Sequence, residues 1–441
     1  MNLSDLQKRD LKHLWHPCAQ MKDYESFPPM EIVSAKGSLL QTANDGEMID
    51  IISSWWCKSL GHGHEDIQQS VKNQMDKFEH VILANTSNEL IVNLCEKMIA
   101  LNPAYDKVFF ADSGSDGVEV AVKMSLQYQQ QNGQEQRKKF MSLQNAYHGE
   151  TILTLALGDC GLYSAPYAAL MPEVKKILDV PYVTGRVEDL EEEDFSELLK
   201  PLEEYEDELA GIVIEPVLQG AGGMLFYHPS FIKALREWTS ERGVHLIADE
   251  ILTGIGRLGK ARACEFANVV PDFSVFSKSM TAGFTPMSCV LTTNEIFDGF
   301  YDEYESGRAF MHSNTYTGNA ISAAAAVAAI DYYEREQVFA RVAKDSAYMH
   351  QLFEDVAKDT GALLNVRSCG FVAAADLDVS LKGLDKKRCG YSLYKKAVKK
   401  GLLLRPLGDT VYFLPPLNTS NELLAKSADI MKELIFEELR S

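Results

Sequence analysis

Chemically useful side chains follow four apolar, strand-like runs in the middle of this 441-residue chain. The runs are KVFFAD, KKFMSLQ, VHLIA and FSVFS. Within a few residues after them come Gly114 and Ser115, Tyr147 and His148, Asp249, and Lys278. These groups could bind an anion, stack on a ring, hold a proton and attack a carbonyl.

Lys278 lies between an apolar run and a string of small residues, in PDFSVFSKSMTAGF. Removing an ammonium group from water is costly, so a lysine here is either on a surface loop or kept partly dry for a purpose. A lysine in dry surroundings loses its proton more easily and can form a Schiff base with a carbonyl. The stretch alone leaves both interpretations open.

The SGS after KVFFAD precedes a helical stretch, which places Gly114 and Ser115 at a helix N-terminus. The free N–H groups and the positive end of the helix dipole favour a phosphate there. The alternative is that Ser115 only caps the helix. After the second run, NAYHGET is expected to expose Tyr147 and His148 beside a glycine.

Short apolar runs alternate with amphipathic helical stretches from about residue 106 to residue 290. This alternation predicts an α/β fold with a mainly parallel sheet that helices cover on both faces. Ligands of such sheets bind beyond the carboxyl ends of the strands, which is where the four groups of residues are expected.

The chain is long enough for two domains. We expect a large domain over residues 61–330 and a smaller C-terminal domain over residues 331–441. Residues 1–60 contain strand-like pieces without a complete core, so we expect them to pack with the smaller domain. The acidic run at 187–211 has apolar residues at roughly helical spacing, which predicts a solvated helical face.

Two short motifs resemble a dinucleotide-binding site and a metal site, but neither has the surroundings that such a site needs. GIGRLG at 254–259 matches the dinucleotide-binding pattern, but that pattern must follow a strand directly and begin a helix. Here the strand ends at Asp249 and KARACEF is a poor helix start. GHGH at 61–64 has no further ligand spaced to complete a metal site, so a loop is the better interpretation.

The composition is that of a soluble globular protein, with 46% hydrophobic and 24% charged residues. A net charge of −20 argues against a nucleic acid or an anionic membrane as partner.

The eight cysteines form no C-x-x-C pair, which is typical of reduced thiols in the cytosol. The N-terminus lacks the apolar core of an export signal, and the alanine-rich run at 320–330 is too short to span a bilayer.

Pyridoxal phosphate needs all four groups of residues at once. Its phosphate needs the helix N-terminus, its ring a stacking partner, its ring nitrogen a carboxylate and its aldehyde a lysine. This coincidence is more specific than any one of the four groups.

The sequence also resembles the class III aminotransferases of the fold-type I pyridoxal-phosphate enzymes over nearly its whole length. Within this class it looks like the branch that makes 7,8-diaminononanoate in biotin synthesis. The matching segments are HLWHP, SSWW, ADSGS, VEVAVKM, NAYHGET, IEPVLQGAGGM, LIADEILTGIGRLGK, FMHSNTYTGN and LLRPLGD. SSWW and LRPLGD are the signals of the branch. Leu252 favours it too, because many relatives that accept ω-amino acids carry glutamine there.

The resemblance implies a large domain with a mainly parallel, seven-stranded sheet and a smaller α+β domain built from both termini. It implies that Lys278 binds the aldehyde of pyridoxal phosphate, Asp249 pairs with the ring nitrogen and Tyr147 stacks on the ring. Gly114 and Ser115 would bind the phosphate, together with Asn314 and Thr315 of a second subunit. The implied substrate-binding residues are Cys18, Trp55, Trp56, Ser313, Arg405 and Tyr412. The protein would therefore be a homodimer with shared active sites.

The resemblance implies 8-amino-7-oxononanoate as the acceptor, and it favours S-adenosylmethionine over lysine as the amino donor. Cys18 departs from the family, since most adenosylmethionine users carry a tyrosine there and the lysine users a phenylalanine. Cysteine is smaller and adds no group that recognises a lysine ammonium. The alternatives are the lysine-using enzyme, another class III enzyme (an ω-amino-acid aminotransferase or an aminomutase that keeps its amine), and a nucleotide-binding protein without enzymatic activity.

Overall fold

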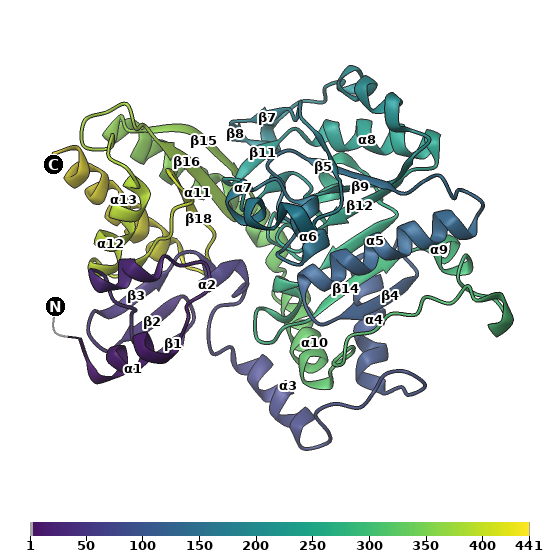
Figure 1. Ribbon diagram of the computed structural model, residues 1–441. Coiled ribbons are helices and arrows are strands. Elements are labelled where there is room, and N and C mark those ends of the chain that lie inside the picture. The colour runs from purple at the N-terminus through teal and green to yellow at the C-terminus, as the bar shows by residue number, and fades with distance from the viewer. Residues whose placement is uncertain (1–2, 441) are drawn as a thin grey trace.

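The computed structural model describes residues 3–440, apart from the side chain of Leu162. Two bodies lie side by side in Figure 1. One contains the large sheet and its helices, and the other combines the N-terminal strands with the C-terminal helices and strands.

The large sheet has seven strands in the order β4-β14-β13-β12-β9-β5-β6. β14 is antiparallel to both of its neighbours, while the pairs from β13 to β6 are parallel. This confirms the prediction of a mainly parallel sheet. The strands are β4 (Lys107–Ala111), β14 (Ser288–Thr292), β13 (Phe273–Phe276), β12 (His245–Asp249), β9 (Leu209–Ile214), β5 (Lys139–Leu143) and β6 (Lys175–Ile177).

The central strands are apolar on both faces because helices cover both faces. Every residue of β9, β12, β13 and β14 is buried. α5 (Gly114–Gln131) packs against β14, β13 and β9, and α8 (Pro229–Arg242) packs against β12. α10 (Ala320–Arg335) is the alanine-rich helix, and its small side chains let it pack closely on α3 (Glu65–Met75) and α4 (Glu89–Leu101). Within residues 3–440, no helix is long and apolar enough to cross a membrane.

Two four-stranded sheets form the second body, and both join distant parts of the chain. One has the order β1-β2-β3-β17, so the C-terminal β17 (Leu402–Leu403) extends a sheet of N-terminal strands. The other has the order β18-β16-β15-β8, which places β8 (Gly185–Arg186) from the middle of the chain beside C-terminal strands. The remaining members are β1 (Ile32–Lys36), β2 (Leu39–Thr42), β3 (Gly46–Asp50), β15 (Leu363–Cys369), β16 (Val372–Leu377) and β18 (Thr410–Phe413). Domain boundaries at residues 60 and 330 stay a prediction.

Several helices and short elements complete the fold. The helices of the second body are α1 (Asp5–His13), α11 (Val338–Thr360), α12 (Cys389–Lys399) and α13 (Asn421–Leu439). Shorter α-helices are α2 (Ser53–Trp56), α6 (Ile152–Leu157), α7 (Gly161–Ser164) and α9 (Asn294–Asp298). A small sheet joins β7 (Tyr182–Val183), β10 (Leu218–Gln219) and β11 (Leu225–Tyr227).

The acidic run differs from its prediction. It forms the short 3₁₀ helices η3 (Val187–Asp189) and η4 (Ser196–Tyr205) in place of an α-helix. Pro201 lies inside η4 and has no N–H to donate, which explains why a regular α-helix does not form. The GIGRLG segment forms turns after β12 and leads into the five-residue 3₁₀ helix η5 (Ala263–Ala267), which agrees with discounting the dinucleotide-binding pattern.

Candidate active site

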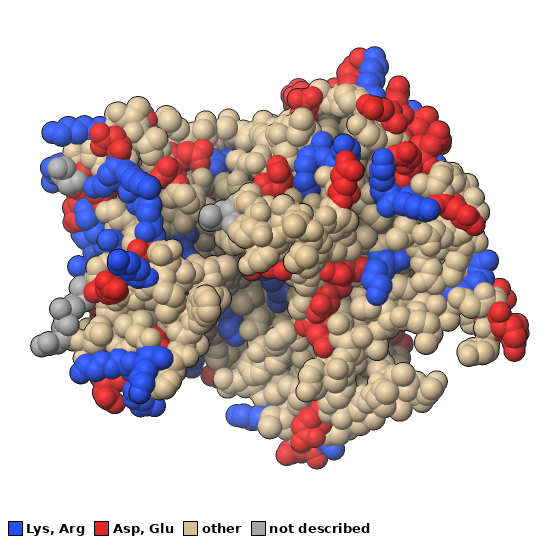
Figure 2. Space-filling model, in the orientation of Figure 1, with Lys and Arg blue, Asp and Glu red and all other residues tan. Residues whose placement is uncertain are grey.

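A cavity of about 160 Å³ lies where the two bodies meet and contains Lys278. Its walls come from α2, from the segment after β5, from α7, from the 3₁₀ helix η6 (Lys278–Thr281), and from the chain between β17 and β18. Figure 2 shows a hollow between the two bodies with basic atoms visible in its depth. A larger hollow of about 880 Å³, lined by His228 and Lys233 among others, contains none of the predicted site residues.

Lys278 is separated from the end of β13 by one residue and begins η6 with a positive φ of 35°. This left-handed backbone is uncommon outside glycine, so the surrounding structure holds Lys278 in a strained position. Its Nζ lies 5.7 Å from the centroid of the Trp56 ring. Burial lowers the pKa of Lys278, and the negative charges of Asp249 and Glu215 oppose that shift. The amine is thus only partly exposed and loses its proton more easily than an ordinary lysine.

Asp249 is the last residue of β12 and is 4% exposed. Its Oδ2 lies 2.8 Å from Nδ1 of His148, and its Oδ1 accepts a hydrogen bond from the N–H of Ile251. His148 is buried, at 2% exposure, so the prediction that it is exposed was wrong. The cause is its pairing with the buried carboxylate, which the sequence did not indicate.

Tyr147 lines the cavity and is held at both ends by carboxylates. Its N–H donates to Oε2 of Glu215 over 2.8 Å, and its hydroxyl donates to Oε1 of Glu150 over 3.1 Å. Glu215 also accepts the N–H of Gly220, and its burial raises its pKa to about 7. Glu215 comes directly after β9, much as Asp249 ends β12, so the strand-end signal could have identified it.

Gly114 and Ser115 are the first two residues of α5. The N-cap is Ser113, whose hydroxyl accepts the N–H of Asp116, so the alternative that Ser115 is the cap was wrong. A Cβ on Gly149 would lie 2.0 Å from Oγ of Ser115. The segment after β5 therefore touches the N-terminus of α5, and only glycine allows this approach.

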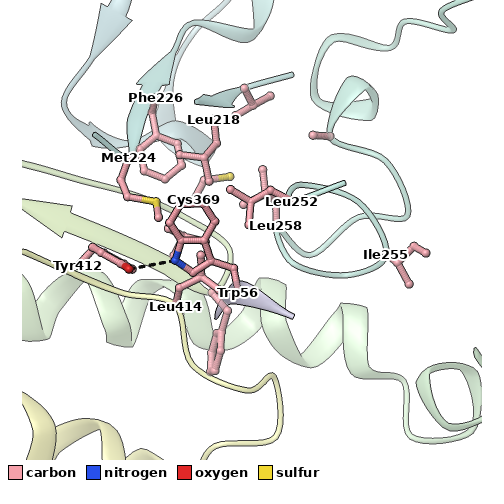
Figure 3. Packing of buried hydrophobic residues seen from close by; sticks show 14 of the residues in the cluster. Trp56, Leu218, Met224, Phe226, Leu252, Ile255, Leu258, Cys369, Tyr412 and Leu414 are labelled. Atoms are coloured by element: carbon pink, nitrogen blue, oxygen red, sulfur yellow. Dashed lines mark hydrogen bonds between the residues drawn. The ribbon is translucent and has the colours of Figure 1, made fainter. Parts of the chain in front are cut away.

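The SSWW segment forms a strained turn at the cavity. Ser53, Ser54 and Trp56 all have positive φ, at 50°, 60° and 64°. Asp50 holds the turn by accepting hydrogen bonds from the N–H and the hydroxyl of Ser54. Figure 3 shows Trp56 packed among apolar side chains, with its Nε1 donating to the hydroxyl of Tyr412 over 3.0 Å. Strain of this kind is typical of functional sites, where it fixes side chains in place.

Trp55 is more exposed than Trp56, and its ring stacks with the guanidinium of Arg405. Trp55 is 45% exposed, and the guanidinium carbon of Arg405 lies 4.3 Å from the centroid of its ring. Arg405 also donates to the carbonyl of Cys18 over 3.4 Å. No carboxylate within residues 3–440 forms an ion pair with Arg405, so its fork is available to a ligand. Arg405, Trp55, Trp56 and Tyr412 all line the cavity, with Cys18 at its edge.

Ser313, Asn314 and Thr315 do not line the cavity in this single chain. They lie in the loop before α10, where Ser313 and Thr315 are exposed. The neighbouring N–H of Tyr316 donates to Asp112, just after β4. The structure thus brings six of the predicted residues to the cavity, and it places Ser115 and Asp249 against Gly149 and His148, which follow Tyr147. Ser313, Asn314 and Thr315 lie outside the cavity of their own chain.

Sequence reasoning missed three further residues of the site, which are Glu215, Glu150 and Tyr163. It also missed the pairing of His148 with Asp249. Tyr163, in α7, lines the cavity with its ring 5.9 Å from that of Tyr147. No sequence signal marked it, because α7 is a short element outside the strand pattern.

Comparison with known families identifies this arrangement. The family model for class III aminotransferases matches residues 20–435. The chain belongs to the class III aminotransferases. It is 38% identical to the adenosylmethionine-8-amino-7-oxononanoate aminotransferase of Helicobacter pylori over the full length of both chains. It is 31% identical to the protein of the same name from Geobacter sulfurreducens, covering 95% of this chain and 94% of that protein.

Solved structures of this class share the fold. The adenosylmethionine-8-amino-7-oxononanoate aminotransferase of Methanocaldococcus jannaschii superimposes with a TM-score of 0.89 at 28% identity, covering 98% of each chain. An amine transaminase from an uncultivated Pseudomonas species, in its pyridoxal-phosphate-bound form, gives 0.86 at 25% identity, covering 97% of this chain and 98% of that one. As a class III aminotransferase, the protein uses pyridoxal phosphate, which confirms the cofactor prediction.

Proposed function

We propose that this class III aminotransferase moves an amino group from S-adenosylmethionine to 8-amino-7-oxononanoate and forms 7,8-diaminononanoate for biotin synthesis. The names of its relatives at 31% identity or more support this substrate pair. The observation that carries the proposal is the cavity itself. Lys278 lies in one wall, tryptophans line it, and the unpaired Arg405 is in another wall. Such a cavity suits an alkyl chain with a carboxylate at its far end.

Four features of the site fit pyridoxal phosphate. The N-terminus of α5, at Gly114 and Ser115, would hold the phosphate. Tyr147 would stack on the ring, and Asp249 would pair with the ring nitrogen. Beside Asp249, Nε2 of the buried His148 has no hydrogen-bond partner within residues 3–440, as expected of a group that completes its contacts when a ligand binds. When bound, the cofactor supplies an electron sink for the α-carbon of an amino acid.

The residues of the chain then have separate tasks. Nζ of Lys278, with its lowered pKa, takes the proton from the α-carbon of the donor as a general base. The carboxylate of Asp249, oriented by His148, keeps a proton on the ring nitrogen. Tyr147, fixed by Glu215 and Glu150, would supply the aromatic surface on which the ring stacks.

Substrate binding is assigned to the other side of the cavity. Arg405 would bind the carboxylate of 8-amino-7-oxononanoate through two parallel N–H groups. Trp55 and Trp56 would line its alkyl chain. The implied contacts of Cys18, Ser313 and Tyr412 with substrate belong to the same proposal.

We also propose that the enzyme is a homodimer in which Asn314 and Thr315 of one subunit reach the phosphate of the other. Their loop carries large exposed apolar side chains, with Met311 at 88% and Tyr316 at 59% exposure, which is consistent with a contact surface. Light scattering after gel filtration measures the mass, and a monomer at working concentration would contradict the proposal. A cytoplasmic location likewise stays a prediction.

The reaction is tested by incubating the enzyme, loaded with pyridoxal phosphate, with S-adenosylmethionine and 8-amino-7-oxononanoate. Mass spectrometry should detect 7,8-diaminononanoate, and omission of either substrate should abolish it. The Cys18→Tyr variant should retain this activity or improve on it, because tyrosine is the usual residue of adenosylmethionine users. Product formed with lysine in place of S-adenosylmethionine would show the lysine-using version, and conversion of ω-amino acids alone would show another class III enzyme.

A further inference from the structure

A second hollow, of about 280 Å³, adjoins the active-site cavity. The two share Glu150 and Tyr163, so the hollow continues the cavity outward past α7. Its other walls are apolar or aromatic and come from α6 and from the 3₁₀ helix η2 (Ala165–Leu170). They are Ile152, Leu155, Pro166 and Tyr167.

The size of the active-site cavity makes such an extension necessary. Pockets that enclose a drug-sized ligand measure roughly 300–1,000 Å³, and the cavity around Lys278 measures about 160 Å³. The ring of pyridoxal phosphate would take up part of this space, so the nucleoside of an adenosyl sulfonium does not fit beside it. If its amino acid end lies at Lys278, its nucleoside must extend out of the cavity.

The chemistry of the hollow suits a flat, uncharged heteroaromatic ring. Tyr167 is 49% exposed and Ile152 is 40% exposed, although both are large and apolar. Pro166 and the ring of Tyr163 add further flat apolar surface. Nucleobases stack on surfaces of this type because each has an aromatic face.

The charges at the junction fit a cationic donor. The carboxylate of Glu150 lies where the hollow meets the cavity, accepting from the hydroxyl of Tyr147 and lying 3.8 Å from Sγ of Cys18. Burial raises the pKa of Tyr163, and the nearby Cys18 and Glu150 add to that shift, which places these three side chains together. A positively charged sulfonium is favoured beside Glu150 and disfavoured beside Arg405. These two charges therefore favour one orientation of the donor in the cavity.

We propose that this hollow, from Tyr163 to Tyr167, is the subsite that binds the nucleobase of the amino donor, with Glu150 facing the sulfonium. The inference rests on the proposed donor and adds where and how the chain recognises it. The acceptor has no ring and does not use the hollow. The two tyrosines therefore distinguish donor from acceptor.

The test uses Tyr167→Ala, at a half-exposed side chain that contributes little to the core, and Tyr163→Ala as a second variant. Tyr348→Ala, at an equally large tyrosine on α11 that is 36% exposed, is the matched control. Each half-reaction is followed by cofactor absorbance, with S-adenosylmethionine on one side and 7,8-diaminononanoate on the other. We expect the apparent Kd for S-adenosylmethionine to rise about tenfold in Tyr167→Ala, with its limiting rate within about threefold of wild type. The diaminononanoate half-reaction should change by less than about threefold, and Tyr167→Phe should restore binding.

Each other outcome overturns the inference. An unchanged Kd for S-adenosylmethionine in both alanine variants, or equal weakening of both half-reactions, removes the hollow as a donor subsite while the proposed reaction stands. A wild-type enzyme that reacts with lysine and not with S-adenosylmethionine overturns the donor assignment itself, and the subsite with it. The wild-type control therefore separates the two failures.

Discussion

Removal of the guanidinium of Arg405 should damage one half of the reaction far more than the other. Arg405 stacks on Trp55 at 4.3 Å and has no carboxylate partner within residues 3–440. Hydrogen bonds between an arginine and a carboxylate are worth about 1.5–3 kcal/mol, which corresponds to roughly 10- to 150-fold in affinity. We expect Arg405→Ala to weaken the acceptor by one to two decades.

The assay measures the two half-reactions separately by cofactor absorbance. The apparent Kd for 8-amino-7-oxononanoate should rise, while the half-reaction with S-adenosylmethionine should change by less than about threefold. Arg405→Lys should recover part of the loss, because it keeps the charge but not the two-pronged geometry. Arg440→Ala, at an arginine 5.9 Å from the ring of Phe436, is the control for removing an arginine that contacts an aromatic ring elsewhere. Equal damage to both half-reactions would refute the reasoning and show that Arg405 supports the fold or serves both substrates.

Three further predictions concern the opposite wall of the cavity and the residues behind it. Lys278→Ala should lower turnover by about 10²–10⁴, the usual contribution of a general base, and turnover near that of wild type would exclude the assignment. Asp249→Asn should still let Lys278 bind the cofactor but slow removal of the α-proton, seen by stopped-flow absorbance; a full rate would make Asp249 structural. Glu215 has a pKa raised to about 7 from 4.5, so its contribution to stability is complete below about pH 4.5 and is lost as pH rises through about 7. The free energy of unfolding of the wild type should therefore fall by up to about 3 kcal/mol between about pH 5 and pH 8, and Glu215→Gln should reduce this slope; parallel slopes in urea titrations would contradict the raised pKa.

The strand pattern explains why much of the site could be predicted. Apolar runs buried on both faces of a parallel sheet mark their own carboxyl ends, so Tyr147, Asp249 and Lys278 could be placed near one another from sequence. The SSWW turn and Arg405 could not be placed this way. Their part in the site was inferred from the family resemblance, and the structure brings them to the same cavity.

The remaining features depend on contacts between distant segments. His148 is buried because Asp249 lies beside it, 101 residues away in the chain, and no local pattern records that pairing. The acidic run becomes 3₁₀ helix at Pro201, although its apolar spacing alone favoured an α-helix. Asn314 and Thr315 lie outside the cavity of their own chain, because their proposed site belongs to a second subunit.

The central claim is most directly tested by offering single amino donors to the enzyme loaded with pyridoxal phosphate. S-adenosylmethionine alone should convert the absorbance of the bound cofactor, and later addition of 8-amino-7-oxononanoate should restore it with one equivalent of 7,8-diaminononanoate. Lysine at the same concentration should leave the spectrum unchanged. Conversion by lysine and not by S-adenosylmethionine would contradict the account.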